Sequence, residues 1–152
     1  MSLNLSAPLV AIESHAKASG LFERVIRREP LSAPGSGLTA AVWGQRLRPI
    51  ALQSGLNVTS AAANFFFRVY AELAQEPAED VDVLVFGALG DVMGRLTGDF
   101  TLGGTVSSID LLNRHGVPMD SAMGYLTQDN KTFRTGTLLI PLIFNDVWEQ
   151  VP

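Results

Sequence analysis

Two periodicities of apolar residues divide this chain into helices and strands. Between residues 59 and 73, small or apolar side chains alternate with more polar ones, and this period of two predicts a strand whose odd-numbered positions face a core. Between residues 77 and 96, apolar residues recur at helical spacing, which predicts an amphipathic helix lying on a sheet. Its stripe consists of Val81, Leu84, Val85, Ala88, Leu89, Val92, Met93 and Leu96.

The remaining elements follow from shorter patterns. A first helix is predicted from about Ser6, as N-cap, to Gly20, as C-terminal stop. Further strands are predicted over residues 21–28, 38–47, 105–112 and 119–127, with a last strand after a hairpin turn at 128–131, and loops at 30–37, 97–104 and 113–118. The order is helix, three strands, helix, three strands. It predicts one α+β domain over residues 1–152, with helices packed on a largely antiparallel sheet.

The C-terminal stretch, residues 136–152, is densely apolar. From Thr137 to Phe144 the predicted strand is apolar on both faces, so both faces should be buried. Pro141 cannot donate a hydrogen bond to a neighbouring strand, which predicts an unpaired edge or a bulge there. An edge strand with two apolar faces indicates a subunit interface.

The long helix carries a second, smooth stripe formed by Val83, Gly87, Gly90 and Gly94. Each interior glycine costs about 1 kcal/mol of helix stability relative to alanine. We therefore expect another backbone to approach this stripe closely. The partner is either the first helix, through its small alanines, or an adjacent subunit.

Composition also favours association. The chain is 47% hydrophobic and only 17% charged, below the typical ~25% charged residues of a globular domain, so we expect apolar surface to be covered by partner subunits. The chain lacks cysteine, which excludes a disulfide framework and fits a reducing cytoplasm. Neither a secretory signal nor an apolar run long enough for a membrane span is visible, and no membrane association is predicted.

Charge is unevenly distributed. The net charge of −4 argues against a surface that grips nucleic-acid phosphates. Arginines concentrate at Arg24, Arg27, Arg28, Arg46 and Arg48, whereas residues 76–99 hold acids that include Asp80 and Asp82. These are either ordinary solvated faces or patches that pair head-to-tail in a ring.

The even-numbered face of the strand at 59–73 combines Phe66, Arg68 and Tyr70. Aromatic residues and arginine are enriched in protein interfaces, so this face is a candidate subunit contact. The alternative is a few scattered surface aromatics.

Residues capable of chemistry are sparse. His15 and His115 have no metal-site spacing, and Ser14 and Ser121 lack the context of a nucleophile. The pairs Asp80 with Asp82 and Asp99 with Asp110 could hold a divalent ion, but helix-start and loop-capping roles explain them better. The glycines at 87–91 lie within a helix and form no phosphate loop. We predict neither catalytic residues nor a cofactor or metal.

Six stretches together resemble a known family, the tail terminator proteins of long-tailed, non-contractile (siphovirus-type) phages of actinobacteria. They are Gly-Leu-Phe-Glu-Arg-Val at 20–25, Glu-Pro with Ala-Pro-Gly-x-Gly-Leu-Thr-Ala-Ala at 29–41, Gly-Asp-Phe-Thr-Leu-Gly-Gly at 98–104, Ile-Asp-Leu-Leu at 109–112, Gly-Tyr-Leu-x-Gln-Asp at 124–129 and Asn-Asp-Val-Trp-Glu-Gln at 145–150. The resemblance covers almost the whole chain. None of these stretches is a catalytic motif.

The resemblance implies a structural virion protein that assembles in the host cytoplasm. It would form a homo-oligomeric, hexameric ring on the head-proximal end of the tail tube, at the head–tail junction. Its partners would be the tail tube protein and the head–tail connector, and genomic DNA would pass through the lumen without specific binding. The ring would stop tube growth and offer a docking surface to the head.

Candidate contact residues are the arginines, Phe66, Arg68, Tyr70, the acidic residues Asp80 and Asp82, and Trp148 near the C-terminus. Residues 45–57 fit none of the family patterns and are expected to face the lumen or a neighbouring ring. The alternatives are a head-completion or connector protein, or a small ligand-binding or enzymatic α+β domain with a pocket lined by Phe65, Phe67 and Phe144.

Overall fold

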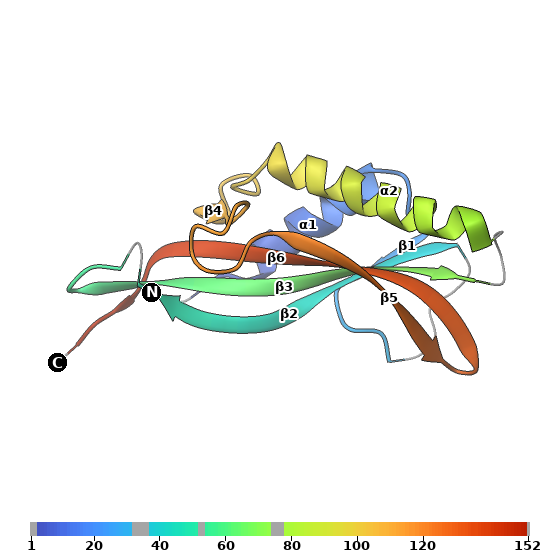
Figure 1. Ribbon diagram of the computed structural model, residues 1–152. Helices are drawn as coiled ribbons and strands as arrows, with labels where there is room; N and C mark the ends of the chain where they lie inside the picture. Colours follow the sequence, from blue (N-terminus) through green and yellow to red (C-terminus); the bar gives the residue numbers. More distant parts are fainter. Residues whose placement is uncertain (1–2, 32–36, 52–53, 74–77, 152) are drawn as a thin grey trace.

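The computed structural model describes residues 3–31, 37–51, 54–73 and 78–151. Both helices lie on one side of a long, curled sheet (Figure 1). The predicted order of helix, three strands, helix, three strands is confirmed. The elements are α1 (Ser6–Ala18), β1 (Arg24–Ile26), β2 (Leu38–Ile50), β3 (Val58–Glu72), α2 (Ala78–Thr97), β4 (Ser108–Ile109), β5 (Asp120–Gln128) and β6 (Lys131–Glu149).

The sheet is built around its two longest strands, β3 and β6. Its order is β1-β2-β3-β6-β4, with β5 also pairing to β6, and every pair is antiparallel except β1 with β2. The predicted strands at 21–28 and 105–112 shrink to β1 and β4. At β4 the chain leaves the sheet because the Asp110 carboxylate accepts hydrogen bonds from the N–H groups of Arg114 and His115 at 2.6 and 2.7 Å, which folds a loop.

The core lies between the helices and one face of the sheet, which we call the helix face. As predicted, the odd positions of β3 point into it, and the even positions of β6 lie beside them. The inner stripe of α2 is also as predicted, except that Leu84 is 41% exposed. The buried core comprises Ile12 and Ala16 of α1, Val81, Val85, Ala88, Leu89, Val92 and Leu96 of α2, and Phe65, Phe67, Leu138, Ile140 and Leu142 of the sheet.

The start of α1 differs from the prediction. Ser6 is the first helical residue, and the N-cap position belongs to Leu5, which has no capping side chain. Asn4 supplies the missing acceptor, since its Oδ1 accepts a hydrogen bond from the N–H of Ala7 at 3.2 Å. Gly20 follows the helix end with φ +72°, a backbone conformation that glycine adopts without strain.

The prediction that the apolar C-terminal strand is an edge strand is wrong, although the unpaired position predicted at Pro141 is present. β6 pairs with β3 on one side and with β5 and then β4 on the other. The Pro141 carbonyl accepts the N–H of Asp110 at 2.9 Å. In an antiparallel strand the nitrogen and carbonyl of one residue point to the same side. The missing donor of Pro141 therefore faces the gap where β5 ends and β4 begins, and no hydrogen bond to β3 is lost.

A bulge follows near the end of β6. Thr59 is opposite Trp148, but Ala61 is opposite Phe144, so β6 gains extra residues there. Asp146 adopts φ +55°, and its N–H is satisfied by Ser60 Oγ at 3.0 Å. The bulge bends the end of β6 so that Val147 and Trp148 pack on the core.

Glycine allows the closest contact between α2 and the sheet, but not at the predicted positions. A Cβ on Gly136 of β6 would lie 2.5 Å from Leu89 Cδ1 and 2.8 Å from Val85 Cγ1. At Gly87, Gly90 and Gly94, by contrast, a Cβ would meet no described atom within 4 Å. The first helix is therefore not the partner of this stripe, and the adjacent-subunit alternative remains.

Neither of the helices in the described residues covers the other face of the sheet, which we call the open face. Its ends are nonetheless buried: Tyr70 packs with Ala41 and Phe133, and Ile50 packs with Ala62 and Ile143. The even positions Ala62 and Tyr70 of β3 are therefore buried within the chain, because residues of β2 and β6 pack against them on the open face. Between these clusters, the half-buried side chains of Trp43, Phe66, Arg68 and Leu139 form the middle of the open face.

Candidate interaction surfaces

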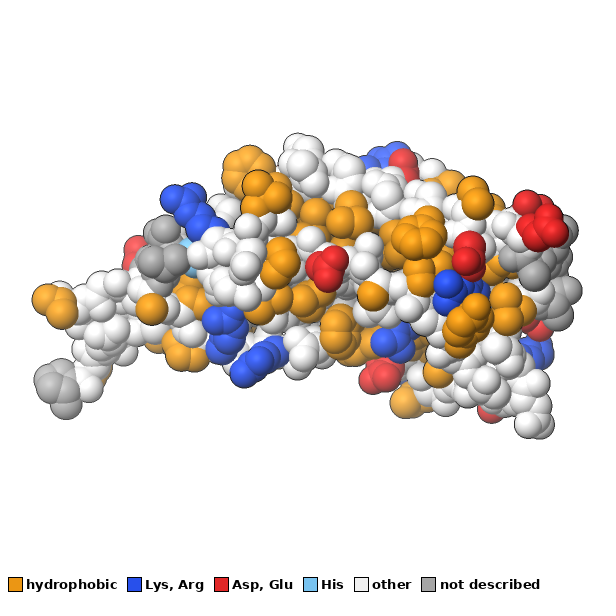
Figure 2. All heavy atoms as spheres, viewed as in Figure 1, with side chains coloured by type: hydrophobic (Ala, Val, Ile, Leu, Met, Phe, Trp, Pro, Cys, Tyr) orange, Lys and Arg blue, Asp and Glu red, His pale blue; other side chains and the backbone are white. Residues whose placement is uncertain are grey.

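The five arginines do not form one patch. Arg24 lies opposite Thr39 of β2, whereas Arg46 and Arg48 lie further along the same strand. At ~3.4 Å per residue, the stretch of β2 from Thr39 to Arg46 spans about 24 Å. Arg27 Nε pairs with Glu13 of α1 at 2.7 Å, so this arginine ties β1 to a helix. Figure 2 also shows basic side chains in separate groups rather than one field.

Arg46 and Arg48 belong to a second basic group at the far end of β2. Arg46 is exposed, and Arg48 is half-buried and donates a hydrogen bond from Nη2 to the His115 carbonyl at 2.9 Å. Arg114, in the loop after β4, lines a hollow with Arg48. This loop, held by the buried Asp110 carboxylate, therefore reaches across the open face to β2.

The acidic candidates lie at the start of α2, on the helix side of the sheet. Asp80 is exposed in the first turn, where Figure 2 shows a group of acidic side chains. Asp82 accepts a hydrogen bond from Arg134 Nε of β6 at 2.6 Å, and this bond raises the pKa of Arg134 further. The Arg134 guanidinium also lies 4.3 Å from the Tyr125 ring centroid. Asp82 thus has a partner within its own chain.

Of the three contact residues predicted on β3, Phe66 and Arg68 lie together on the open face, whereas Tyr70 is buried. Phe66 and Arg68 lie in the middle of the open face with Trp43: the Arg68 guanidinium is 5.2 Å from the tryptophan ring, and its Nε donates to Thr137 Oγ1 at 2.7 Å. Trp43 and Phe66 meet edge to face at 6.0 Å. Tyr70 as a surface contact is a wrong prediction. It is 1% exposed, and burial raises the pKa of its hydroxyl.

Trp148 is half-buried and packs on the core cluster, opposite Thr59. Its ring therefore stabilises the end of the domain in addition to any contact with a partner. The last described residues remain beside β3, since the Gln150 N–H donates to the Asn57 carbonyl at 2.7 Å.

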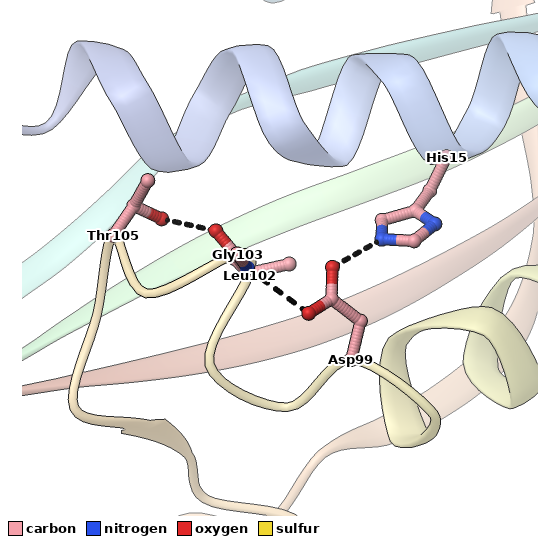
Figure 3. Close-up of polar contacts among 5 residues, drawn as sticks. All are labelled: His15, Asp99, Leu102, Gly103 and Thr105. Atoms are coloured by element: carbon pink, nitrogen blue, oxygen red, sulfur yellow. Dashed lines mark hydrogen bonds and ion pairs between the residues drawn. The ribbon is translucent and has the colours of Figure 1, made fainter.

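His15 and Asp99 form a polar tie between α1 and the loop after α2 (Figure 3). His15 Nε2 lies 2.8 Å from Asp99 Oδ2, and the Gly103 N–H donates to Asp99 Oδ1 at 2.9 Å. These two hydrogen bonds, the His15 bond first, lower the pKa of Asp99. The loop-capping roles expected for Asp99 and Asp110 are confirmed, because both carboxylates bind backbone N–H groups of their own loops.

Among the described residues, no group of three or more histidine, aspartate or glutamate side chains is arranged to hold a metal ion. Phe65, Phe67 and Phe144 do not line a common pocket, because all three fill the core. None of the helices in the described part of the chain is long and apolar enough to cross a bilayer.

Three features that the sequence did not single out are prominent in the structure. Leu139 and Trp43 complete the middle of the open face. Asn64, beside them on β3, is 4% exposed, and its Oδ1 has no hydrogen-bond partner among the described residues.

Within the described chain, β5 pairs only with β6, and β1 covers only Thr39–Ala41 of β2. The sheet therefore has two free edges.

Neither the family models nor the curated proteins compared with this chain give a match.

Proposed function

We propose that this protein is a ring-forming subunit that caps the head-proximal end of the tail tube of a long-tailed, non-contractile phage. The observation that carries the proposal is a sheet with helices on one face only and two free edges, in a chain whose six family-like stretches span almost its whole length. A subunit of this shape has the unsatisfied surface that a ring requires.

The proposed action is geometric and involves no reaction. One surface of the ring matches the end of the tail tube, and the opposite surface differs from a tube ring, so that another tube ring cannot add. The same surface then receives the connector of the head. The modest net charge of −4 suits a conduit through which DNA passes without being held.

Tail-tube growth in vitro tests the proposal. Purified tube protein is polymerised with and without this protein, and tube lengths and ends are recorded by electron microscopy. We expect shorter tubes with a ring at one end. Unchanged tube lengths, together with co-sedimentation with empty heads rather than with isolated tails, would instead favour a head-completion protein.

A further inference from the structure

The two free edges of the sheet differ in character. β5 is a nine-residue edge strand without proline or lysine, features that natural edge strands use to prevent pairing with other chains. The free part of β2, residues 42–50, carries a bulge between Gly44 and Arg46 and a proline at position 49. Two β2 edges are therefore poorly suited to each other, whereas the edge of β5 is open to a partner strand.

The strand directions match a head-to-tail joint between copies. β2 is antiparallel to β3, β3 to β6, and β6 to β5. In a ring whose symmetry axis runs roughly along the strands, all copies of β2 point the same way. β5 of one copy would then meet β2 of the next copy in the antiparallel sense, and the alternation would continue from subunit to subunit.

Charge and side-chain size select one register for this joint. Even residues of β5 lie on the open face, as do Trp43, Arg46 and Arg48 of β2. Placing the exposed Asp120 opposite Arg48 of the next copy brings opposite charges together. Allowing for the bulge at Gln45, the same register places Gly124 opposite Trp43, so that the indole covers a position without a side chain.

We infer that residues 120–125 of β5 in one copy pair with residues 42–48 of β2 in a second copy, with Asp120 opposite Arg48 and Gly124 opposite Trp43. The pairing ends there because β1 of the second copy already covers residues 39–41. This inference rests on the proposed ring and names its subunit joint. The joint is heterologous, because two different edges meet, and repeated contacts of this kind close into a ring when the rotation from one copy to the next divides a full turn evenly.

Engineered disulfides test this joint directly, because the chain has no cysteine of its own. In the inferred register Ser121 lies opposite Leu47, and both side chains are on the helix face. Within one chain, β3 and β6 separate these strands by three spacings, about 14 Å, whereas a disulfide needs Cα atoms within about 7 Å. A disulfide in the double variant Ser121→Cys/Leu47→Cys must therefore join two chains.

We expect the oxidised double variant to give a ladder of covalent multimers. Each single variant, and the register-shifted control Ser121→Cys/Arg46→Cys, should remain uncrosslinked. Dimers from Ser121→Cys alone would overturn the inference by showing β5 paired with itself. A ring-sized assembly that does not crosslink would also overturn it while leaving the proposed function intact. Protein that neither assembles nor binds tails would overturn both.

A charge exchange provides a second readout. Asp120→Lys and Arg48→Glu should each raise the protein concentration needed for assembly at least tenfold, and the double exchange should restore most of the loss. Because Arg48 also donates to the His115 carbonyl, circular dichroism must first show that Arg48→Glu is folded. If the double variant is folded and its loss of assembly equals the sum of the two single losses, Asp120 and Arg48 do not face each other across the joint.

Discussion

The inner and outer sides of α2 differ in how closely they are packed. On its inner side, Val85 and Leu89 pack so closely on Gly136 of β6 that a methyl group has no room. On its outer side, Gly87, Gly90 and Gly94 leave open space, and Val83 and Phe86 are 73% and 57% exposed. The residues on the inner side are accounted for by contacts within one chain. The outer side costs about 1 kcal/mol of helix propensity per glycine with no compensating contact among the described residues.

Small residues in a helix therefore do not by themselves locate a close contact. Within the chain, the small residue at the helix–sheet contact lies on the sheet. We propose that the outer glycines serve a contact with a neighbouring subunit, the alternative that the structure leaves in place.

The inner side of α2 should be far more sensitive to truncation of a valine than the outer side. Val85 is fully buried, so Val85→Ala should lower the free energy of unfolding by roughly 1.5–3 kcal/mol. Val83→Ala is the matched control two residues away and should change it by less than about 0.5 kcal/mol. Urea denaturation measures both. Equal losses would contradict the assignment of inner and outer sides.

Gly136→Ala should destabilise the protein by about 1–3 kcal/mol, because the new methyl group would overlap Leu89 and Val85. Combining it with Leu89→Ala makes room for that methyl group. The double variant should therefore lose less stability than the sum of the two single variants. Strict additivity would mean that α2 does not pack on Gly136 as described.

Gly90→Ala should have the opposite sign and stabilise the isolated chain by up to about 1 kcal/mol. Light scattering should at the same time show weaker assembly, because the added methyl group would separate the neighbouring subunit from α2. Higher stability with unchanged assembly would show that the outer side of α2 makes no close contact.

The smallest effect concerns the tie between α1 and the loop that follows α2. Since the His15 contact lowers the pKa of Asp99, ionised Asp99 stabilises the fold above the ordinary aspartate pKa of 3.8. This contribution is lost as the pH falls through the lowered value. Asp99→Asn should cost less than about 1 kcal/mol at pH 7, because the pair is partly exposed. A cost that does not shrink in acid would contradict the assigned cause.

Periodicity along the sequence predicted much of the fold. The alternation in β3 and the helical repeat in α2 record which side of each element is buried, so the element order and the inner stripe were predictable. The central position of β6 in the sheet was not predictable, because strand order depends on contacts between residues far apart in the sequence. Pro141 suggested an edge strand, but it lies where the neighbour of β6 changes from β5 to β4.

The candidate contacts were less predictable for the same reason. Tyr70 looked like a surface residue because its neighbours alternate, but residues distant in sequence, Ala41 and Phe133, bury it. The arginines looked clustered because they are close in sequence, whereas an extended β2 carries them apart. The two free edges depend on how far β1 and β5 extend, which periodicity does not specify.

The most direct test of the central claim is the mass of the purified protein by light scattering, measured alone and with isolated tail tubes. We predict a hexameric ring, either free in solution or bound at one end of the tubes. A protein that stays monomeric at every concentration and leaves the tubes unbound would contradict the claim that this chain forms a ring at the end of a tail.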